Sequence, residues 1–169
     1  MKRRYYIAYG SNLNMKQMRF RCPQAEIIGT SEIKDYELLF KGSQTGSYLT
    51  VEKKKGGSVP VAVWATTAAD EAALDRYEGF PFFYYKAEME LPVQDIRTGK
   101  IKNRKCYVYI MHEDRQLGRP SRRYIRTCLD GYRAFGFEKE ILMRAIENIR
   151  RLSYEECKNN CFKNLSKMP

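Results

Sequence analysis

The sequence predicts one α+β domain in which a small mixed or antiparallel β-barrel is flanked by helices. Short segments rich in branched and aromatic residues fill most of the chain up to residue 111, which is typical of strands. Helical patterns dominate after residue 120. Many consecutive strands with a few helices over one side favour a sheet that curls into a barrel. With 169 residues, of which 43% are hydrophobic, the chain is long enough for one such core.

Seven segments have the composition and alternation of strands, and Gly, Ser or Asp residues separate them. They are Arg3–Tyr9, Glu26–Ile33, Tyr36–Lys41, Tyr48–Glu52, Pro60–Thr66, Phe82–Val93 and Lys102–Met111. Gly56-Gly57 predicts a turn, and Asp95–Gly99 predicts the hairpin connection between the last two strands. The spacing that a phosphate-binding loop or a Rossmann fold requires is absent from the sequence.

Three helices are expected within the domain. The first should begin after Thr67, which forms a capping box with Asp70, and should end before Gly79. The second is predicted over Ser121–Phe135, with the serine at its start. The third, over Glu138–Arg151, carries its apolar residues on one face.

We expect residues 1–152 to form the domain and residues 153–169 to form a basic C-terminal tail. Ser153 is placed to cap a surface helix in this tail, which would pack on the domain or fray from it. No internal repeat or low-complexity linker divides the chain.

The sequence favours a cytoplasmic protein without a disulfide framework. No apolar run approaches the ~20 residues that a membrane-spanning helix needs, and the N-terminal apolar stretch is too short for a signal peptide. The cysteines are odd in number and scattered, which favours reduced thiols. They are Cys22, Cys106, Cys128, Cys157 and Cys161. We expect no metal site, because the only histidine, His112, lies far from the last cysteine pair.

The net charge is +11, and the positive residues occur in several clusters rather than in one stripe. The first acidic residue is Glu26, so the N-terminal region lies in a positive field that attracts carboxylates. The charge fits an ordinary solvated surface, and it also fits a nucleic-acid-binding protein, although no nucleic-acid motif is present. Both interpretations stay open at this point.

Tyr9–Leu13, with the sequence YGSNL, reads as a glycine turn at the end of a strand. Gly10 is able to adopt a positive φ and to let a ligand approach the backbone. Ser11 and Asn12 carry short side chains suited to cap a following helix. The turn is therefore a candidate anion cradle made of backbone N–H groups.

Glu78 lies at the predicted end of the first helix, within seven positions of many aromatic residues. They are Tyr77, Phe80, Phe82, Phe83, Tyr84 and Tyr85. If the carboxyl points inward, desolvation raises its pKa, and a raised carboxyl exchanges protons near neutral pH. The alternative is a solvated glutamate at a helix C-terminus.

The order and spacing of these motifs resemble the gamma-glutamylcyclotransferase-like family. The resemblance covers roughly residues 1–150 and is carried by Tyr9–Leu13, Leu74–Pro81, Tyr84-Tyr85, Cys106–Met111 and Pro120–Tyr124. It implies a small β-barrel and a reaction that releases 5-oxoproline and a free amine from a small-molecule gamma-glutamyl amide. It also implies that neither a metal nor an organic cofactor takes part.

The resemblance implies that Glu78 is the general acid and base. It places the glutamyl group in the turn formed by Tyr9, Gly10, Ser11, Asn12 and Leu13, beside Tyr84 and Tyr124. Tyr84 is preferred over Tyr85, because adjacent strand residues point to opposite faces. Whether the N–H groups hold the α-carboxylate or the oxyanion is left open, as are the identity of the amine and the oligomeric state.

Two further expectations concern the outer pocket and a competing function. The loop after Tyr48 and the segment His112–Pro120 are the expected outer walls, because loops vary on a rigid scaffold. The competing function is a catalytically silent module that binds a small amino-acid-like ligand on the same barrel.

Overall fold

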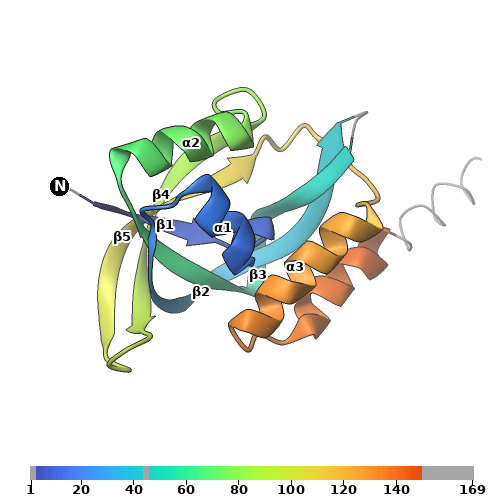
Figure 1. Ribbon diagram of the computed structural model, residues 1–169. Helices are drawn as coiled ribbons and strands as arrows, with labels where there is room; N and C mark the ends of the chain where they lie inside the picture. Colours follow the sequence, from blue (N-terminus) through green and yellow to red (C-terminus); the bar gives the residue numbers. More distant parts are fainter. Residues whose placement is uncertain (1–2, 44–45, 150–169) are drawn as a thin grey trace, which may run out of the picture.

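The computed structural model describes residues 3–43 and 46–149. Its centre is a β-barrel with helices on its outside (Figure 1). The strands are β1 (Arg4–Ala8), β2 (Glu26–Ser43), β3 (Gly46–Thr66), β4 (Tyr84–Asp95), β5 (Ile101–Met111) and the short β6 (Gln116–Leu117). The helices are η1 (Ser11–Leu13, a 3-10 turn), α1 (Met15–Arg21), α2 (Ala68–Glu78) and α3 (Arg122–Ala134). A further helical segment covers residues 139–149.

The barrel closes through five strands in the order β3-β1-β5-β4-β2, because β2 also pairs with β3. The register of β1 shows its central place: Ile7 lies opposite Val63 of the antiparallel β3 and opposite Val108 of the parallel β5. All three side chains are fully buried in the core. The remaining pairs are antiparallel, so the predicted α+β class and the small mixed barrel are confirmed.

Four predicted strands prove to be two long ones, β2 and β3. Asp35 and Gly56, which suggested that the strands end there, instead form an irregularity in the continuous hydrogen-bonded pairing of β2 with β3. Asp35 adopts a φ of 58° where the register between Lys34 and Tyr36 shifts, and its carboxyl accepts a hydrogen bond from the Gly56 nitrogen at 2.8 Å. A bulge of this kind bends a strand without ending it, so the predicted turn at Gly56-Gly57 was wrong.

The helical predictions hold for α2 and α3. Thr67 and Asp70 form the capping box of α2, and Gly79 ends it with a φ of 64°. The Ser121 hydroxyl accepts from the Tyr124 nitrogen at 3.1 Å and caps α3. The helix after the glycine turn is present, but its cap is Asn14 rather than Ser11 or Asn12. The 3-10 turn η1 intervenes, and the side chains of Ser11 and Asn12 are thereby free to face α2.

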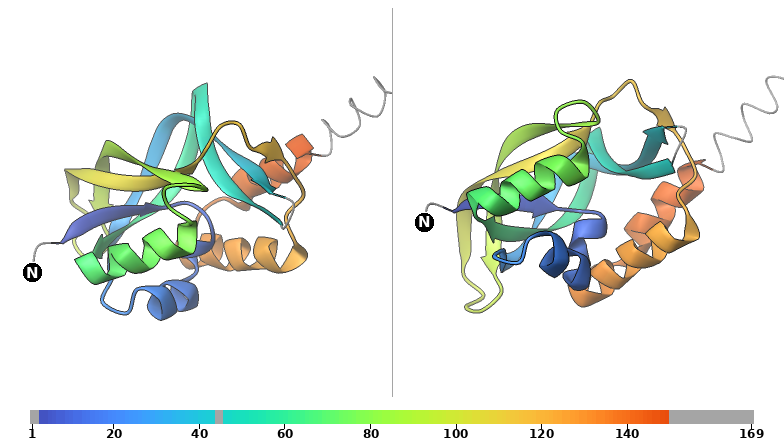
Figure 2. Two further views of the ribbon diagram at one scale, coloured as in Figure 1. Left: turned by 90° about the horizontal axis from the view of Figure 1, so that it is seen from above. Right: turned by 45° about the horizontal axis from the view of Figure 1, so that its top comes forward.

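Two views of the ribbon show how the helices position the site (Figure 2). α2 lies along the barrel near β1, whereas α3 and the segment 139–149 lie together on another side. α3 also packs against η1. The turn after β1 is therefore held between α2 and α3.

Several predictions concern residues outside the described ranges. The boundary at residue 152, the cap at Ser153 and the pair Cys157 and Cys161 stay predictions. Within residues 3–43 and 46–149, Cys22, Cys106 and Cys128 are buried free thiols. None of the described helices is long and apolar enough to cross a membrane.

Candidate active site

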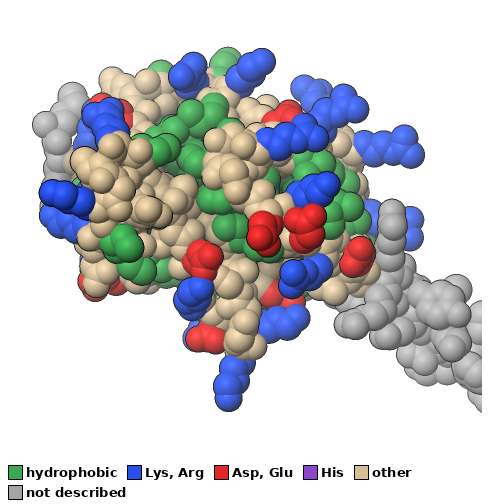
Figure 3. Space-filling view, turned by 90° about the horizontal axis from the view of Figure 1, so that it is seen from below, with side chains coloured by type: hydrophobic (Ala, Val, Ile, Leu, Met, Phe, Trp, Pro, Cys, Tyr) green, Lys and Arg blue, Asp and Glu red, His purple; other side chains and the backbone are tan. Residues whose placement is uncertain are grey.

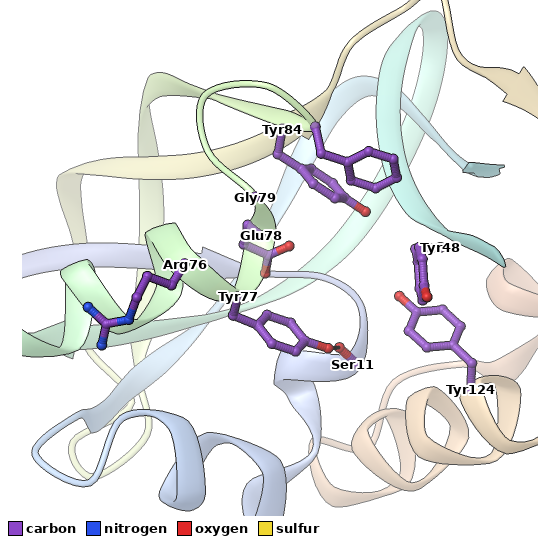
Figure 4. Close-up of a pocket in the computed structure, with 9 residues that line it drawn as sticks. Ser11, Tyr48, Arg76, Tyr77, Glu78, Gly79, Tyr84 and Tyr124 are labelled. Atoms are coloured by element: carbon purple, nitrogen blue, oxygen red, sulfur yellow. Dashed lines mark hydrogen bonds between the residues drawn. The ribbon is translucent and has the colours of Figure 1, made fainter. Parts of the chain in front are cut away.

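The end of α2 and the turn after β1 bring Glu78 and Asn12 together. The Asn12 amide donates one hydrogen bond to the Glu78 carboxyl at 3.0 Å and another to the Tyr6 hydroxyl at 2.8 Å. Beside them, the hydroxyls of Ser11 and Tyr77 lie 3.3 Å apart, and Figure 4 shows Glu78 directed into the space between the surrounding tyrosines. The two motifs are therefore in direct contact, although 66 positions separate them in the sequence.

Burial raises the pKa of Glu78 to about 7, although the positive charge of Arg21 and the hydrogen bond from Asn12 both lower it. Desolvation dominates because aromatic side chains replace water around the carboxyl. The surrounding tyrosines stay neutral hydrogen-bonding groups at the same pH. Burial raises the pKa of Tyr6, Tyr9, Tyr84 and Tyr124 well above the ordinary value of 10.0. Glu78 is thus the group of this site that changes protonation near neutrality.

Gly10 matters in the turn because neighbouring residues pack closely against it, which the sequence did not indicate. Its φ is −123°, so the expected positive φ was wrong. A Cβ atom at this position would instead lie 3.3 Å from the Tyr124 hydroxyl and 3.4 Å from the Cβ of Leu49. A side chain here would be in tight contact with both residues, so the glycine permits their close approach and leaves room beside the backbone.

The other residues of the turn are divided between the site and the core. The Tyr9 hydroxyl donates to the Tyr109 carbonyl at 2.6 Å, which holds the start of the turn against β5. Leu13 is fully buried, and its N–H donates to the Gly10 carbonyl at 3.0 Å. Leu13 therefore packs the turn, and its N–H is already bonded.

Arg21 is a part of the site that the sequence did not reveal. Its guanidinium donates to the Asn12 carbonyl oxygen at 2.5 Å and lies over the ring of Tyr77 at 3.5 Å. It also donates to the Gln17 side chain. Because the carbonyl end of the Asn12 amide is bound to Arg21, its NH2 end faces Glu78. In the sequence, Arg21 is one of many clustered basic residues, and no pattern distinguishes it from the others.

Adjacent tyrosines on β4 point to opposite faces, as expected. The Tyr84 hydroxyl donates to the Leu49 carbonyl at 2.8 Å on the side of Glu78. The Tyr85 hydroxyl donates to Glu113 at 2.7 Å, away from this site. Tyr124, at the start of α3, accepts from the Leu49 nitrogen at 3.1 Å. Leu49 of β3 thereby connects Tyr84 and Tyr124.

Two neighbouring spaces adjoin Glu78. The inner recess, of about 20 Å³, is lined by Tyr6, Tyr9, Gly10, Ser11, Asn12, Leu49, Glu78, Tyr84, Tyr109 and Tyr124. The outer cavity, of about 380 Å³, is lined by Ser11, Tyr48, Arg76, Tyr77, Glu78, Gly79, Phe83, Tyr84 and Tyr124. They share Ser11, Glu78, Tyr84 and Tyr124, so a ligand in the outer cavity is able to reach the turn.

The expected outer walls differ from those in the structure. Tyr48 lines the outer cavity, but the residues after it continue strand β3 and form no loop. Among the described residues that line the cavity, none comes from His112–Pro120. Arg115 of that segment lies 5.1 Å from the ring of Phe83, and Phe83 is the residue that forms the wall.

The predicted aromatic surroundings of Glu78 are present only in part. Tyr77, Phe83 and Tyr84 line the outer cavity, whereas Phe82 is 83% exposed. The remaining rings come from distant segments of the chain: Tyr6, Tyr9, Tyr48, Tyr109 and Tyr124. Of these, Tyr6, Tyr48 and Tyr109 were not predicted as site residues, because nothing local in the sequence shows which distant tyrosines meet at Glu78.

The model of the family "Gamma-glutamyl cyclotransferase, AIG2-like" matches residues 6–127, a range that includes both the glycine turn and Glu78. The chain belongs to this family. A human protein named "Gamma-glutamylcyclotransferase" is 29% identical over 159 residues, which cover 89% of this chain and 74% of the relative. A bovine protein of the same name is 28% identical over 143 residues, which cover 80% of this chain and 73% of the relative.

Solved structures share the fold of this gamma-glutamyl cyclotransferase family member. A structure titled "Gamma-glutamyl cyclotransferase" has a TM-score of 0.71 at 24% identity, and the match covers 88% of this chain and 87% of the other. A cyclotransferase from yeast, described as specific to glutathione, has a TM-score of 0.52 at 11% identity and covers 89% and 99% of the two chains. At these identities, the likeness establishes the barrel and its helices.

The basic charge of this family member is distributed over the surface. Figure 3 shows Lys and Arg side chains around the whole visible face, with Asp and Glu side chains among them. Several of these charges form exposed ion pairs, such as Lys105 with Glu88 at 2.7 Å and Arg3 with Glu26 at 2.9 Å. Within residues 3–43 and 46–149, no group of three His, Cys, Asp or Glu side chains is placed to share a metal ion.

Proposed function

We propose that the protein is a gamma-glutamyl cyclotransferase that releases 5-oxoproline and a free amine from a gamma-glutamyl amide, with Glu78 as general base and general acid. The observation that carries this proposal is a half-buried carboxyl with a pKa of about 7 that is bonded to the Tyr9–Leu13 turn and faces a cavity. A group with this pKa exchanges protons efficiently in both directions near neutral pH.

The proposed reaction begins with deprotonation of the substrate. An α-ammonium group has a pKa of about 8, so it must lose a proton before its nitrogen attacks the γ-carbonyl carbon. The new C–N bond closes the lactam ring, and the bond from that carbon to the leaving nitrogen breaks. Two protons leave the α-nitrogen in total, and the leaving amine takes up two and departs as an ammonium ion. Glu78 accepts and returns these protons, so the reaction consumes no water.

Ring closure depends mainly on how the substrate is folded. The attacking nitrogen and the carbonyl belong to one molecule, and correct orientation of such groups contributes on the order of 7 kcal/mol or more to lowering the barrier. The inner recess admits about one water-sized group and is suited to hold one oxygen of the folded substrate, because Gly10, Ser11 and Asn12 line it and backbone N–H groups bind anionic oxygens. We propose that they bind the α-carboxylate or the developing oxyanion, and that Tyr84 and Tyr124 form the facing wall.

The test uses the variant Glu78→Gln, which keeps the shape of the side chain but cannot accept and donate protons as a carboxyl does. Wild-type protein is incubated with a pool of gamma-glutamyl amides, and 5-oxoproline is measured by mass spectrometry. We expect the variant to lose activity by ~10²–10⁴-fold, because general acid–base catalysis typically contributes that factor. Glu113→Gln serves as the matched control, since Glu113 bonds to Tyr85 outside the cavity.

Circular dichroism and thermal melting establish that both variants are folded. Near-wild-type activity in folded Glu78→Gln would contradict the assignment of the acid and base. If the wild-type protein is protected against thermal unfolding by these compounds but produces no 5-oxoproline from any of them, the silent binding module is the better description. The proposed reaction depends neither on the predicted cytoplasmic location nor on whether the protein binds nucleic acid.

A further inference from the structure

The outer cavity is much larger than the recess beside the turn. The cavity holds about 380 Å³ and the recess about 20 Å³, and Glu78 lies between them. A recess of this volume admits about one water-sized group, such as one oxygen of the glutamyl end. If that oxygen enters the recess and Glu78 faces the scissile amide, the rest of the substrate, including the leaving amine, must lie in the outer cavity. The walls of that cavity then decide which amine is accepted.

Those walls are an array of aromatic rings. Tyr48 packs edge-on against Tyr124, with ring centres 5.2 Å apart and an angle of 84°, and against Phe83, at 6.3 Å and 81°. Phe83 in turn lies 5.3 Å from Tyr84. Aromatic pairs favour this tilted geometry, so another ring entering the cavity finds both faces and edges to contact. Figure 4 shows Tyr48, Tyr77, Tyr84 and Tyr124 around one space.

Most hydroxyl groups of these rings already have protein partners. The Tyr84 and Tyr124 hydroxyls bond to the backbone of Leu49, and the Tyr77 hydroxyl is 3.3 Å from that of Ser11. The rings therefore present mainly carbon surface to a ligand. A polar amine would lose hydration in the cavity and gain few hydrogen bonds in return.

The charges around the cavity disfavour a second positive charge on the amine. Glu78 is the only carboxyl among the described residues that line the cavity, and the reaction itself uses it. Two guanidinium groups lie behind the walls: Arg21 at 3.5 Å from the ring of Tyr77, and Arg115 at 5.1 Å from that of Phe83. Arg76 also lies at the cavity, with its guanidinium directed away from the tyrosines in Figure 4.

We propose that the outer cavity is a leaving-group subsite for amines that carry an aromatic ring and no second positive charge, an inference that rests on the proposed cyclotransferase activity. An aromatic amino acid or an arylalkyl amine fits this description. A diamine does not.

The test compares two matched pairs of substrates by the kcat/KM for release of the lactam product. γ-Glutamyl-phenylalanine and γ-glutamyl-alanine differ only in the ring, and we expect the former to be preferred by about tenfold or more, the range that a hydrophobic pocket provides. γ-Glutamyl-hexylamide and γ-glutamyl-1,5-diaminopentane have the same length and differ in a terminal charge. We expect the uncharged compound to be preferred by about tenfold.

Variants show whether the named rings cause the preference. Tyr48→Ala and Phe83→Ala should each lower the ratio of the phenylalanine to the alanine compound to about twofold, since they remove a ring that the substrate contacts. Tyr48→Phe should keep the ratio, because the ring and not the hydroxyl makes the wall. Phe82→Ala is the matched control, since its exposed ring adjoins Phe83 in sequence but does not line the cavity.

Failure of this subsite is distinguishable from failure of the proposed reaction. Release of 5-oxoproline with equal or greater preference for the alanine or diamine compound would overturn the subsite and leave the activity standing. If no compound yields 5-oxoproline, the activity fails, and calorimetric binding to Glu78→Gln decides the subsite. About tenfold tighter binding of the aromatic compound supports the preference of the cavity for an uncharged aromatic group. Equal binding, or none, overturns it.

Discussion

The inner recess and the outer cavity share Glu78, yet different interactions build their walls. Around the recess, polar side chains form hydrogen bonds to other parts of the fold: Asn12 bonds to Glu78, and Tyr9 bonds to the backbone of β5. Around the outer cavity, the walls are aromatic rings held by packing, and Tyr48 is 37% exposed. Hydrogen bonds fix atoms in position, whereas ring packing fixes a shape and a polarity. We therefore expect substitutions in the recess to change the rate and substitutions in the cavity to change the preference among amines.

Among variants that keep Glu78, the largest effect is expected where the recess is tightest. Gly10→Ala places a methyl group 3.3 Å from the Tyr124 hydroxyl and fills space beside the turn. A displacement of about 1 Å at a reacting group costs ~10²-fold, and we expect kcat/KM to fall by about that factor for every amide. Steady-state kinetics with aromatic and aliphatic amides measure it, and thermal melting establishes folding. A change in preference without a general loss of rate would mean that Gly10 belongs functionally to the cavity.

The second prediction concerns the free energy of unfolding, which the burial of the ionised Glu78 carboxyl lowers. Burial raises the pKa of Glu78 from 4.5 to about 7, so the folded state binds the proton more tightly than the unfolded state. The free energy of unfolding therefore decreases as pH rises from about 4.5 to about 7, and Glu78→Gln removes this decrease. We expect the variant to be more stable than wild type by about 1–3 kcal/mol at pH 8, or roughly 2–8 °C in Tm.

Melting curves from pH 4 to pH 8 test this difference. At pH 4, the wild-type carboxyl is mostly protonated in both states, so the two proteins should melt within about 1–2 °C of each other. Glu113→Gln is again the control, because a hydrogen bond from Tyr85 lowers the pKa of Glu113 and thus reverses the sign of its contribution. A constant difference between Glu78→Gln and wild type at all pH values would show that packing, rather than ionisation, separates them.

Local chemistry made part of this structure predictable from the sequence. The capping box at Thr67, the glycine after Glu78 and the serine before α3 act within a few residues, so their patterns revealed both helices. The alternation of strand side chains likewise favoured Tyr84 over Tyr85. These features depend on sequence neighbours alone.

The features that escaped prediction depend on contacts between distant segments. Asp35 and Gly56 each resemble a turn signal, but they meet across β2 and β3 and form a bulge. Gly10 lets Tyr124 and Leu49 approach the turn closely, which no local pattern shows. Tyr48 joins the site from β3 through the closure of the barrel. Sequence thus pointed to Glu78 and the Tyr9–Leu13 turn, which the fold brings together, whereas the fold determined what surrounds them.

The third prediction uses the paired tyrosines of β4. Tyr84→Phe removes the bond to the Leu49 carbonyl and loosens the wall that Tyr84 shares with Tyr124. We expect a loss of about tenfold in kcat/KM, since a lost buried hydrogen bond typically costs about 1 kcal/mol or more. Tyr85→Phe, which loses only its bond to Glu113, should stay within about twofold of wild type. Equal losses of kcat/KM in the two variants would mean that both substitutions disturb strand β4 as a whole, and that the bond of Tyr84 to Leu49 has no specific effect on the recess.

The smallest effect is expected for a variant that tests how the residues around the recess set the pKa of Glu78. Arg21→Gln removes the positive charge that lowers the pKa of Glu78, so this pKa should rise above its present value of about 7. Because the proposed base must be deprotonated to act, the rising limb of the pH profile of kcat/KM should move to higher pH. At pH 6.5, we expect a loss of about threefold that largely disappears at pH 9, where the carboxyl is ionised in both proteins.

Arg19→Gln provides the matched comparison for Arg21→Gln, because Arg19 is an exposed arginine on the same helix. The two variants change the net charge equally, so a shift confined to Arg21→Gln must come from the position of Arg21 near Glu78, where it also contacts Asn12 and Tyr77. Equal shifts in both variants would assign the effect to the general positive field of the protein. An unchanged profile in Arg21→Gln would show that desolvation by the surrounding rings alone sets the acidity of Glu78, and the recess would then depend on the same aromatic packing as the cavity.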